Sequence, residues 1–215
     1  MKSEIKKYLL STLLCLLPML VFGQGKVYTK SVKLADFPTK ITKVVMTGRP
    51  LLDAAIKSEI TSGWDASPYE FCSPDEYKEI AESTLYYFLH FTTDGNFTYI
   101  DLTKGGPASD SDPLKTSIEV VQMPIGPDGT DFSTAIEYMG VFIDIVQQYA
   151  TKAAESERAA YSGLKAIYAK PKAGDNVREI EILPTAGKWG TSCYKMKFNP
   201  DTHALYKLKK KRISR

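Results

Sequence analysis

Apolar residues recur along this chain with two spacings, every second residue in some segments and about every 3.6 residues in others. The shorter spacing predicts strands at 27–34, 41–46, 69–72, 85–89, 97–102, 117–125, 178–183, 194–198 and 204–211. The longer one predicts helices at 51–63, after residue 73 and through 131–169. Strands outnumber the interspersed helices, which favours an α+β fold: a mixed, mostly antiparallel sheet with packed helices.

The clearest succession of elements lies between residues 63 and 93. Residues 69–72 alternate as a short aromatic strand, and Ser73, Pro74 and Glu76 then have the spacing of a helix start with a capping box. The run 85–89, Leu-Tyr-Tyr-Phe-Leu, is too apolar to be exposed. It is predicted to be a buried central strand.

The predicted fold includes one long helical segment. Asp131 is suited to cap its start, and an apolar stripe continues to about residue 154 and again over 161–168. A straight helix over 131–169 would be about 55–60 Å long, against about 17–20 Å for a typical strand. The polar residues 155–158 therefore predict a bend, and a dimer formed through the long helix is the alternative.

The first 23 residues have the order of an export signal. Lys2, Lys6 and Lys7 precede an apolar run that ends at Gly23, a small residue suited to cleavage. Lipid attachment at Cys15 is the less favoured alternative. We therefore expect residues 1–23 to be a signal peptide, residues 24–215 to form one α+β domain, and the mature protein to be periplasmic or secreted, with no transmembrane segment.

The net charge and the number of cysteines limit the partners and the disulfides that can be expected. The full chain carries +3, of which the signal holds +2, so the mature protein is nearly neutral and a nucleic-acid partner is not expected. Cys72 and Cys193 remain after cleavage. A disulfide between them and two buried thiols are both compatible with the sequence.

No residue pattern predicts catalysis or a cofactor. Cys72 and His90 are the one pair that imitates a thiol nucleophile with its base, but His90 continues an apolar strand and no third partner is evident. His90 and His203 are isolated from each other and from further ligands, so no metal site is predicted.

Two stretches are candidates for binding. Gly48 and Arg49 lie between a predicted strand and a predicted helix, where free N–H groups favour an anionic ligand. The basic end formed by Lys207, Lys209, Lys210, Lys211 and Arg212 suits an anionic polysaccharide or lipid, or protects an edge strand against pairing. On a strand its residues alternate between two faces, so at most half are expected on one of them.

Part of the chain resembles a group of uncharacterised exported proteins from Bacteroidetes-type bacteria. The resemblance rests on Trp64, on Pro-Tyr-Glu-Phe at 68–71, on Tyr-Tyr-Phe-Leu at 86–89 and on Thr-His-Ala-Leu-Tyr at 202–206. It implies export but no activity and no site residues.

The sequence thus favours a non-catalytic exported protein of the cell envelope that acts in ligand binding or assembly, with an envelope protein or an anionic polysaccharide as partner. A small envelope hydrolase with an unrecognised active site, and a structural subunit that forms a homodimer through the long helix, remain alternatives.

Overall fold

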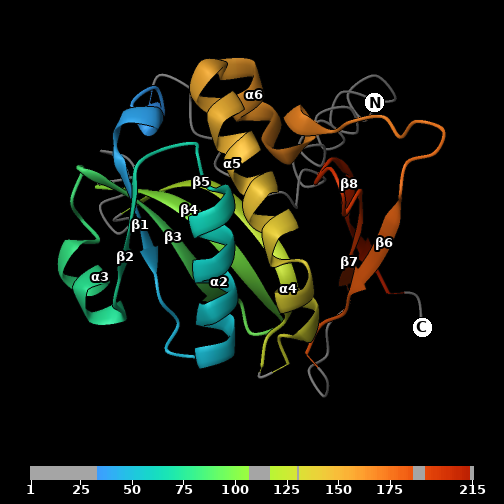
Figure 1. Ribbon diagram of the computed structural model, residues 1–215, viewed down its shortest axis with the longest axis horizontal. Helices are drawn as coiled ribbons and strands as arrows, with labels where there is room; N and C mark the ends of the chain where they lie inside the picture. Colours follow the sequence, from blue (N-terminus) through green and yellow to red (C-terminus); the bar gives the residue numbers. More distant parts are fainter. Residues whose placement is uncertain (1–32, 107–116, 130, 186–191, 214–215) are drawn as a thin grey trace, which may run out of the picture.

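The computed structural model describes residues 33–106, 117–129, 131–185 and 192–213 (Figure 1). The expected signal peptide at residues 1–23, its Cys15, and nearly all of the strand expected at 27–34 lie outside the described residues. Those expectations remain predictions.

A five-stranded mixed sheet forms the centre of the molecule, in the order β2-β1-β3-β4-β5. β1 pairs in parallel with both β2 and β3, and the pairs β3–β4 and β4–β5 are antiparallel. The strands are β1 (Ile41–Val45), β2 (Tyr69–Cys72), β3 (Tyr86–Thr93), β4 (Phe97–Gly105) and β5 (Ser117–Pro127).

A second, antiparallel sheet of three strands follows at the C-terminal end, in the order β6-β7-β8. Its strands are β6 (Arg178–Ile182), β7 (Ser192–Phe198) and β8 (Leu205–Arg212). Figure 1 shows this sheet beyond the β5 edge of the large one. Apolar residues of both sheets belong to one core cluster. The predicted α+β class, with a mixed and mostly antiparallel sheet, is confirmed.

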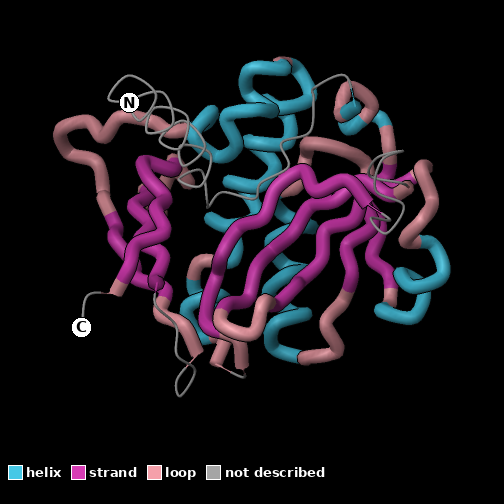
Figure 2. The backbone as a smooth tube through the Cα atoms, turned by 180° about the vertical axis from the view of Figure 1, so that it is seen from behind, coloured by secondary structure: helices cyan, strands magenta, loops and turns pink. Residues whose placement is uncertain are grey.

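Helices cover one face of the five-stranded sheet. α2 and α5 cross this face (Figure 1), whereas the view from behind shows no described helix over the centre of the opposite face (Figure 2). The helices are α2 (Pro50–Gly63), α3 (Pro74–Ile80), α4 (Ser133–Glu137), α5 (Met139–Glu155) and α6 (Glu157–Ser162), with short 3-10 turns η3 (Phe37–Thr39) and η4 (Gly163–Ile167).

The C-terminal helical segment is not continuous. It is interrupted at Tyr138, between α4 and α5, and at Ser156, between α5 and α6. The expectation of one unbroken helix from Asp131 to about residue 154 is thus wrong, and the first helical residue is Ser133. The bend predicted at 155–158 does occur, and there the Ser156 hydroxyl accepts a hydrogen bond from Ala159 N.

The aromatic strand lies at the centre of the sheet, as predicted. β3 is the middle strand, and the side chains of Tyr87 and Phe88, which point to opposite faces, are both fully buried. Leu85 is an exception, because it precedes β3 and is 65% exposed. The helix start at Ser73 is confirmed, since the Ser73 hydroxyl accepts the backbone N–H of Glu76 at 3.1 Å.

The two cysteines are free and buried, one in each sheet, with Cys72 at the end of β2 and Cys193 in β7. Burial raises the pKa of the Cys72 thiol to about 11. No described helix has the length and apolar character needed to cross a membrane.

Candidate functional site

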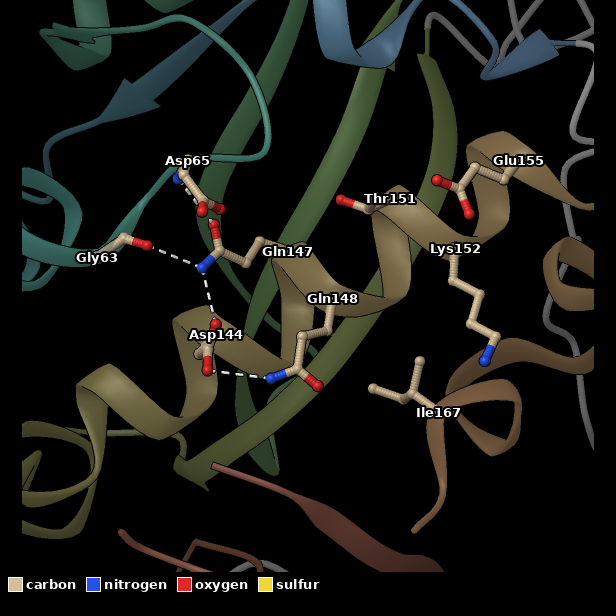
Figure 3. Close-up of a pocket in the computed structure, with 9 residues that line it drawn as sticks. All are labelled: Gly63, Asp65, Asp144, Gln147, Gln148, Thr151, Lys152, Glu155 and Ile167. Carbon is tan, nitrogen blue, oxygen red and sulfur yellow. Dashed lines mark hydrogen bonds between the residues drawn. The ribbon is translucent and has the colours of Figure 1, made fainter. Parts of the chain in front are cut away.

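A polar hollow of about 630 Å³ lies beside α5, where that helix faces the end of α2 and the turn after it (Figure 3). Three carboxylates, two amides and one ammonium line it, together with three other residues. The lining residues are Gly63, Asp65, Asp144, Gln147, Gln148, Thr151, Lys152, Glu155 and Ile167. Its volume is within the range of small-ligand sites.

Gln147 fixes the wall of the hollow on the α2 side. Its amide donates to the Gly63 carbonyl at 2.9 Å and to the Asp144 carboxylate at 2.7 Å, and its carbonyl accepts Asp65 N at 3.1 Å. Figure 3 shows the side chain between these partners. Gln147 is itself buried, so the last turn of α2 and the middle of α5 are held in fixed register.

The Asp144 carboxylate is the centre of the hydrogen-bond network. It accepts from the side-chain amides of Gln147 and Gln148, the second at 3.0 Å. His203, from the turn between β7 and β8, contributes its Nδ1 at 3.1 Å from Asp144 Oδ2. The backbone φ of His203 is +55°, a conformation that L residues adopt rarely. Asp144 and His203 thus form a carboxylate–imidazole pair between residues 59 positions apart in the sequence.

A second hollow, of about 360 Å³, has His203 in its lining and is thus linked to the first by the Asp144–His203 contact. It is lined by Glu59, Glu137, Tyr138, Gly140, Val141, Arg178, Pro200 and His203. A Cβ at Gly140 would lie 2.5 Å from the Glu59 carboxylate, so a larger residue there would have to push this side chain aside. We refer to the two hollows together as the α5 groove.

The α5 groove is acidic. The first hollow carries Asp65, Asp144 and Glu155 against one Lys152, and the second adds Glu59 and Glu137 against Arg178. Among the described residues, the carboxylates of Asp65 and Glu155 form no hydrogen bond or ion pair. The groove therefore carries negative charge that is not neutralised by these residues, next to the hydrogen-bonded side chains of Gln147 and Asp144. Such an arrangement attracts cations.

The predicted site residues lie elsewhere. Gly48 and Arg49 do occupy the turn between β1 and α2, but the Asp53 carboxylate of this chain accepts the N–H groups of Thr47 and Gly48, at 2.8 and 3.0 Å. The Arg49 guanidinium lies 4.4 Å from the centre of the Phe132 ring. An external anion would have to displace Asp53, and ligand binding at this turn remains a prediction.

The other candidates stay apart from the α5 groove. Cys72 and His90 lie on different strands, with β1 between those strands, and His90 packs against the Tyr77 ring at 5.2 Å. Burial lowers the pKa of His90 to about 4, so this imidazole is neutral at physiological pH. In the part of the chain that the structure describes, no three His, Cys, Asp or Glu residues are close enough to hold a metal ion.

Comparison with known proteins gives no match: no family model fits the chain, and neither a curated protein nor a solved structure is similar to it at the significance required. The resemblance to exported bacterial proteins therefore remains a prediction. Sequence reasoning missed the α5 groove, although the polar residues 144, 147, 148, 151 and 155 on one face of an otherwise apolar helix were a detectable signal.

Proposed function

We propose that this chain is a non-catalytic, exported protein of the cell envelope, which binds a cationic ligand in the α5 groove. The observation that carries the proposal is the pair of carboxylates of Asp65 and Glu155, which have no partner among the described residues, in a hollow otherwise fixed by hydrogen bonds. Export is supported by the order of charge, apolar run and small residue in residues 1–23. Such a protein acts in the periplasm or outside the cell.

The ligand that suits this groove is an amine or guanidinium group, such as a basic segment of a partner protein. Carboxylates accept charge-assisted hydrogen bonds from such groups, and the amide of Gln148 extends the polar wall. The groove needs little reorganisation to bind, because Gln147 and Asp144 are already held by several partners each.

Binding of tetralysine, measured by calorimetry at low salt, tests the proposal. We expect the double variant Asp65→Asn, Glu155→Gln to weaken binding by about tenfold or more, because two charge-assisted contacts are lost. Glu79→Gln with Glu82→Gln is the matched control: both residues are exposed, belong to the α3 region and leave the same net charge. Equal weakening in both double variants would mean that tetralysine binding depends only on the net charge of the protein.

A hydrolase is the second candidate, and the Asp144–His203 pair is the observation that favours it. A carboxylate that orients an imidazole is a common general-base arrangement. The lining residues of the α5 groove include the hydroxyls of Thr151 and Tyr138 but no serine or cysteine, and in this candidate reaction His203 activates water. Hydrolysis of an activated ester that is lost in His203→Gln, with an unchanged unfolding midpoint, would favour this candidate over the first.

A further inference from the structure

The outward face of the C-terminal sheet carries an array of lysines. Strand alternation and register place Lys207, Lys209 and Lys211 of β8 on one face, next to Lys195 and Lys197 of β7. We call these five side chains the lysine face. All are exposed except Lys195, which is half-buried. Three of the five basic residues at the C-terminal end therefore share a face, rather than half at most, because Leu208 occupies one of the alternate positions.

The other face of the same sheet points into the core. Met196 and Phe198 are fully buried there, and Lys210 is also turned to this side, with its ammonium 5.3 Å from the centre of the Tyr194 ring. Along β7 and β8 one face is therefore mainly apolar and the other mainly lysine, with Lys210 on the first and the buried Cys193, opposite Lys211, on the second.

Only part of this charge is neutralised within the chain. Glu181 lies 3.3 Å from Lys195, and Glu179 lies 2.7 Å from Lys197. Among the described residues, Lys207, Lys209 and Lys211 form no ion pair. The lysine face thus keeps a net charge of about +3 over one side of a small sheet.

Edge protection does not account for this arrangement. β8 is an edge strand, and a single lysine on it is a usual defence against pairing. Lys195 and Lys197, however, belong to the middle strand and lie directly opposite Lys209 and Lys207. Facing like charges destabilise a sheet, so this pairing has a cost that protection of an edge does not require.

We propose that the lysine face binds the surface of an anionic membrane. The face is a strand surface rather than a groove, so its ammonium groups contact many headgroups at once. At the end of the sheet next to Lys211, the exposed apolar side chains of Leu183 and Ile213 follow β6 and β8. Apolar groups beside a basic array suit the interface of a bilayer better than a soluble polysaccharide.

The test is sedimentation of the purified chain with vesicles of phosphatidylglycerol and phosphatidylcholine in equal amounts, and with vesicles of phosphatidylcholine alone. We expect binding to the first only, and a steep loss of binding as salt is raised. The triple variant Lys207→Gln, Lys209→Gln, Lys211→Gln should reduce the partition coefficient by roughly 100-fold.

The matched control is Lys57→Gln, Lys78→Gln, Lys165→Gln, which removes the same charge from positions outside the C-terminal sheet. It should bind as the wild type does, and so should the groove variant Asp65→Asn, Glu155→Gln. The unfolding midpoint of each variant establishes that it is folded.

Three outcomes would overturn the proposal: no binding to anionic vesicles, equal loss in both triple variants, or binding to soluble alginate without binding to vesicles. The last would assign the lysine face to an acidic polysaccharide. None of them bears on the α5 groove, which is tested separately with tetralysine.

Discussion

The five-stranded sheet and the C-terminal sheet differ in how their residues divide between core and solvent. Nearly every residue of β4 is buried, whereas β8 buries only Leu205 and Tyr206 and exposes most of its other side chains. The centre of the large sheet is therefore specified by burial along nearly the whole length of β4 and the first half of β3. The small sheet has one apolar face, and its Met196 and Phe198 belong to the same core cluster as the large sheet.

This difference indicates that the small sheet depends on the large one. Three short strands with a single apolar face are close to the lower limit of independent stability. Changes in the centre of the large sheet should therefore unfold the whole chain, and changes on the outer face of the small sheet should have small effects.

The largest effect is expected at the centre of the large sheet. Phe88 is fully buried, and its ring contacts Tyr77 at 5.0 Å and Tyr86 at 6.2 Å between ring centres. Phe88→Ala should lower the free energy of unfolding by about 3–5 kcal/mol. Tyr86→Ala, at a half-buried position of the same strand, should cost less. Urea unfolding monitored by circular dichroism measures both, and equal losses would contradict the burial difference.

The dependence of the small sheet is tested at Phe198, which is fully buried against Tyr138 at 5.1 Å between ring centres. Phe198→Ala should cost about 3 kcal/mol and leave one cooperative transition, because the two sheets share a core. Hydrogen exchange on β3 and β7 is the measurement. If only the β7 amides lost protection while those of β3 kept theirs, the two sheets would be separate units of unfolding.

Acid should act on the large sheet first, through His90. Burial lowers the pKa of His90 from 6.5 to about 4, so between these values the unfolded chain binds more protons than the folded one. The contribution of His90 to stability is therefore full above pH 6.5 and falls as the pH drops toward 4, by about 1.4 kcal/mol per pH unit at most. Unfolding of His90→Phe at pH 7 and pH 5 should show a weaker dependence; an unchanged slope would assign the effect to other groups.

A smaller loss of stability is expected at the turn before α2, which follows β1 of the five-stranded sheet. Asp53→Ala removes the acceptor for Thr47 N, Thr47 Oγ1 and Gly48 N, and should cost about 1–2 kcal/mol. If Gly48 and Arg49 bind an anion, inorganic phosphate should restore part of the lost stability and shift the Gly48 amide resonance. Identical thermal unfolding with phosphate and with chloride at equal ionic strength would rule out an anion site there.

The smallest effect is expected on the lysine face. Lys209→Glu replaces a like-charge cross-strand pair with Lys195 by an opposite-charge pair, and should stabilise the chain by about 0.5 kcal/mol at low salt. Lys165→Glu, on η4 outside the C-terminal sheet, is the control for overall charge. A destabilised Lys209→Glu variant would show that the lysines stabilise the fold. It would contradict the expectation that the outer face of the small sheet, unlike the centre of the large sheet, contributes little to stability.

Patterns of neighbouring residues in the sequence were sufficient to predict most of the helices and strands. Ser73 and Glu76 predicted where α3 begins, and the Ser73 hydroxyl does accept the Glu76 N–H there. The apolar run 85–89 identified the central strand, and the α+β class followed from the order of elements. These features rest on residues within a few positions of one another, where chain geometry alone determines which side chains meet.

The tertiary structure alone decided the contacts between distant parts of the chain. The parallel pairing of β1 with β3, the separation of β6, β7 and β8 into their own sheet, and the break at Tyr138 have no local signature. Asp144 and His203 are 59 residues apart, and only the packing of α5 against the turn after β7 brings them together. Periodicity predicts which face of an element is apolar, but not which other element covers it, because many partners bury the same apolar area equally well.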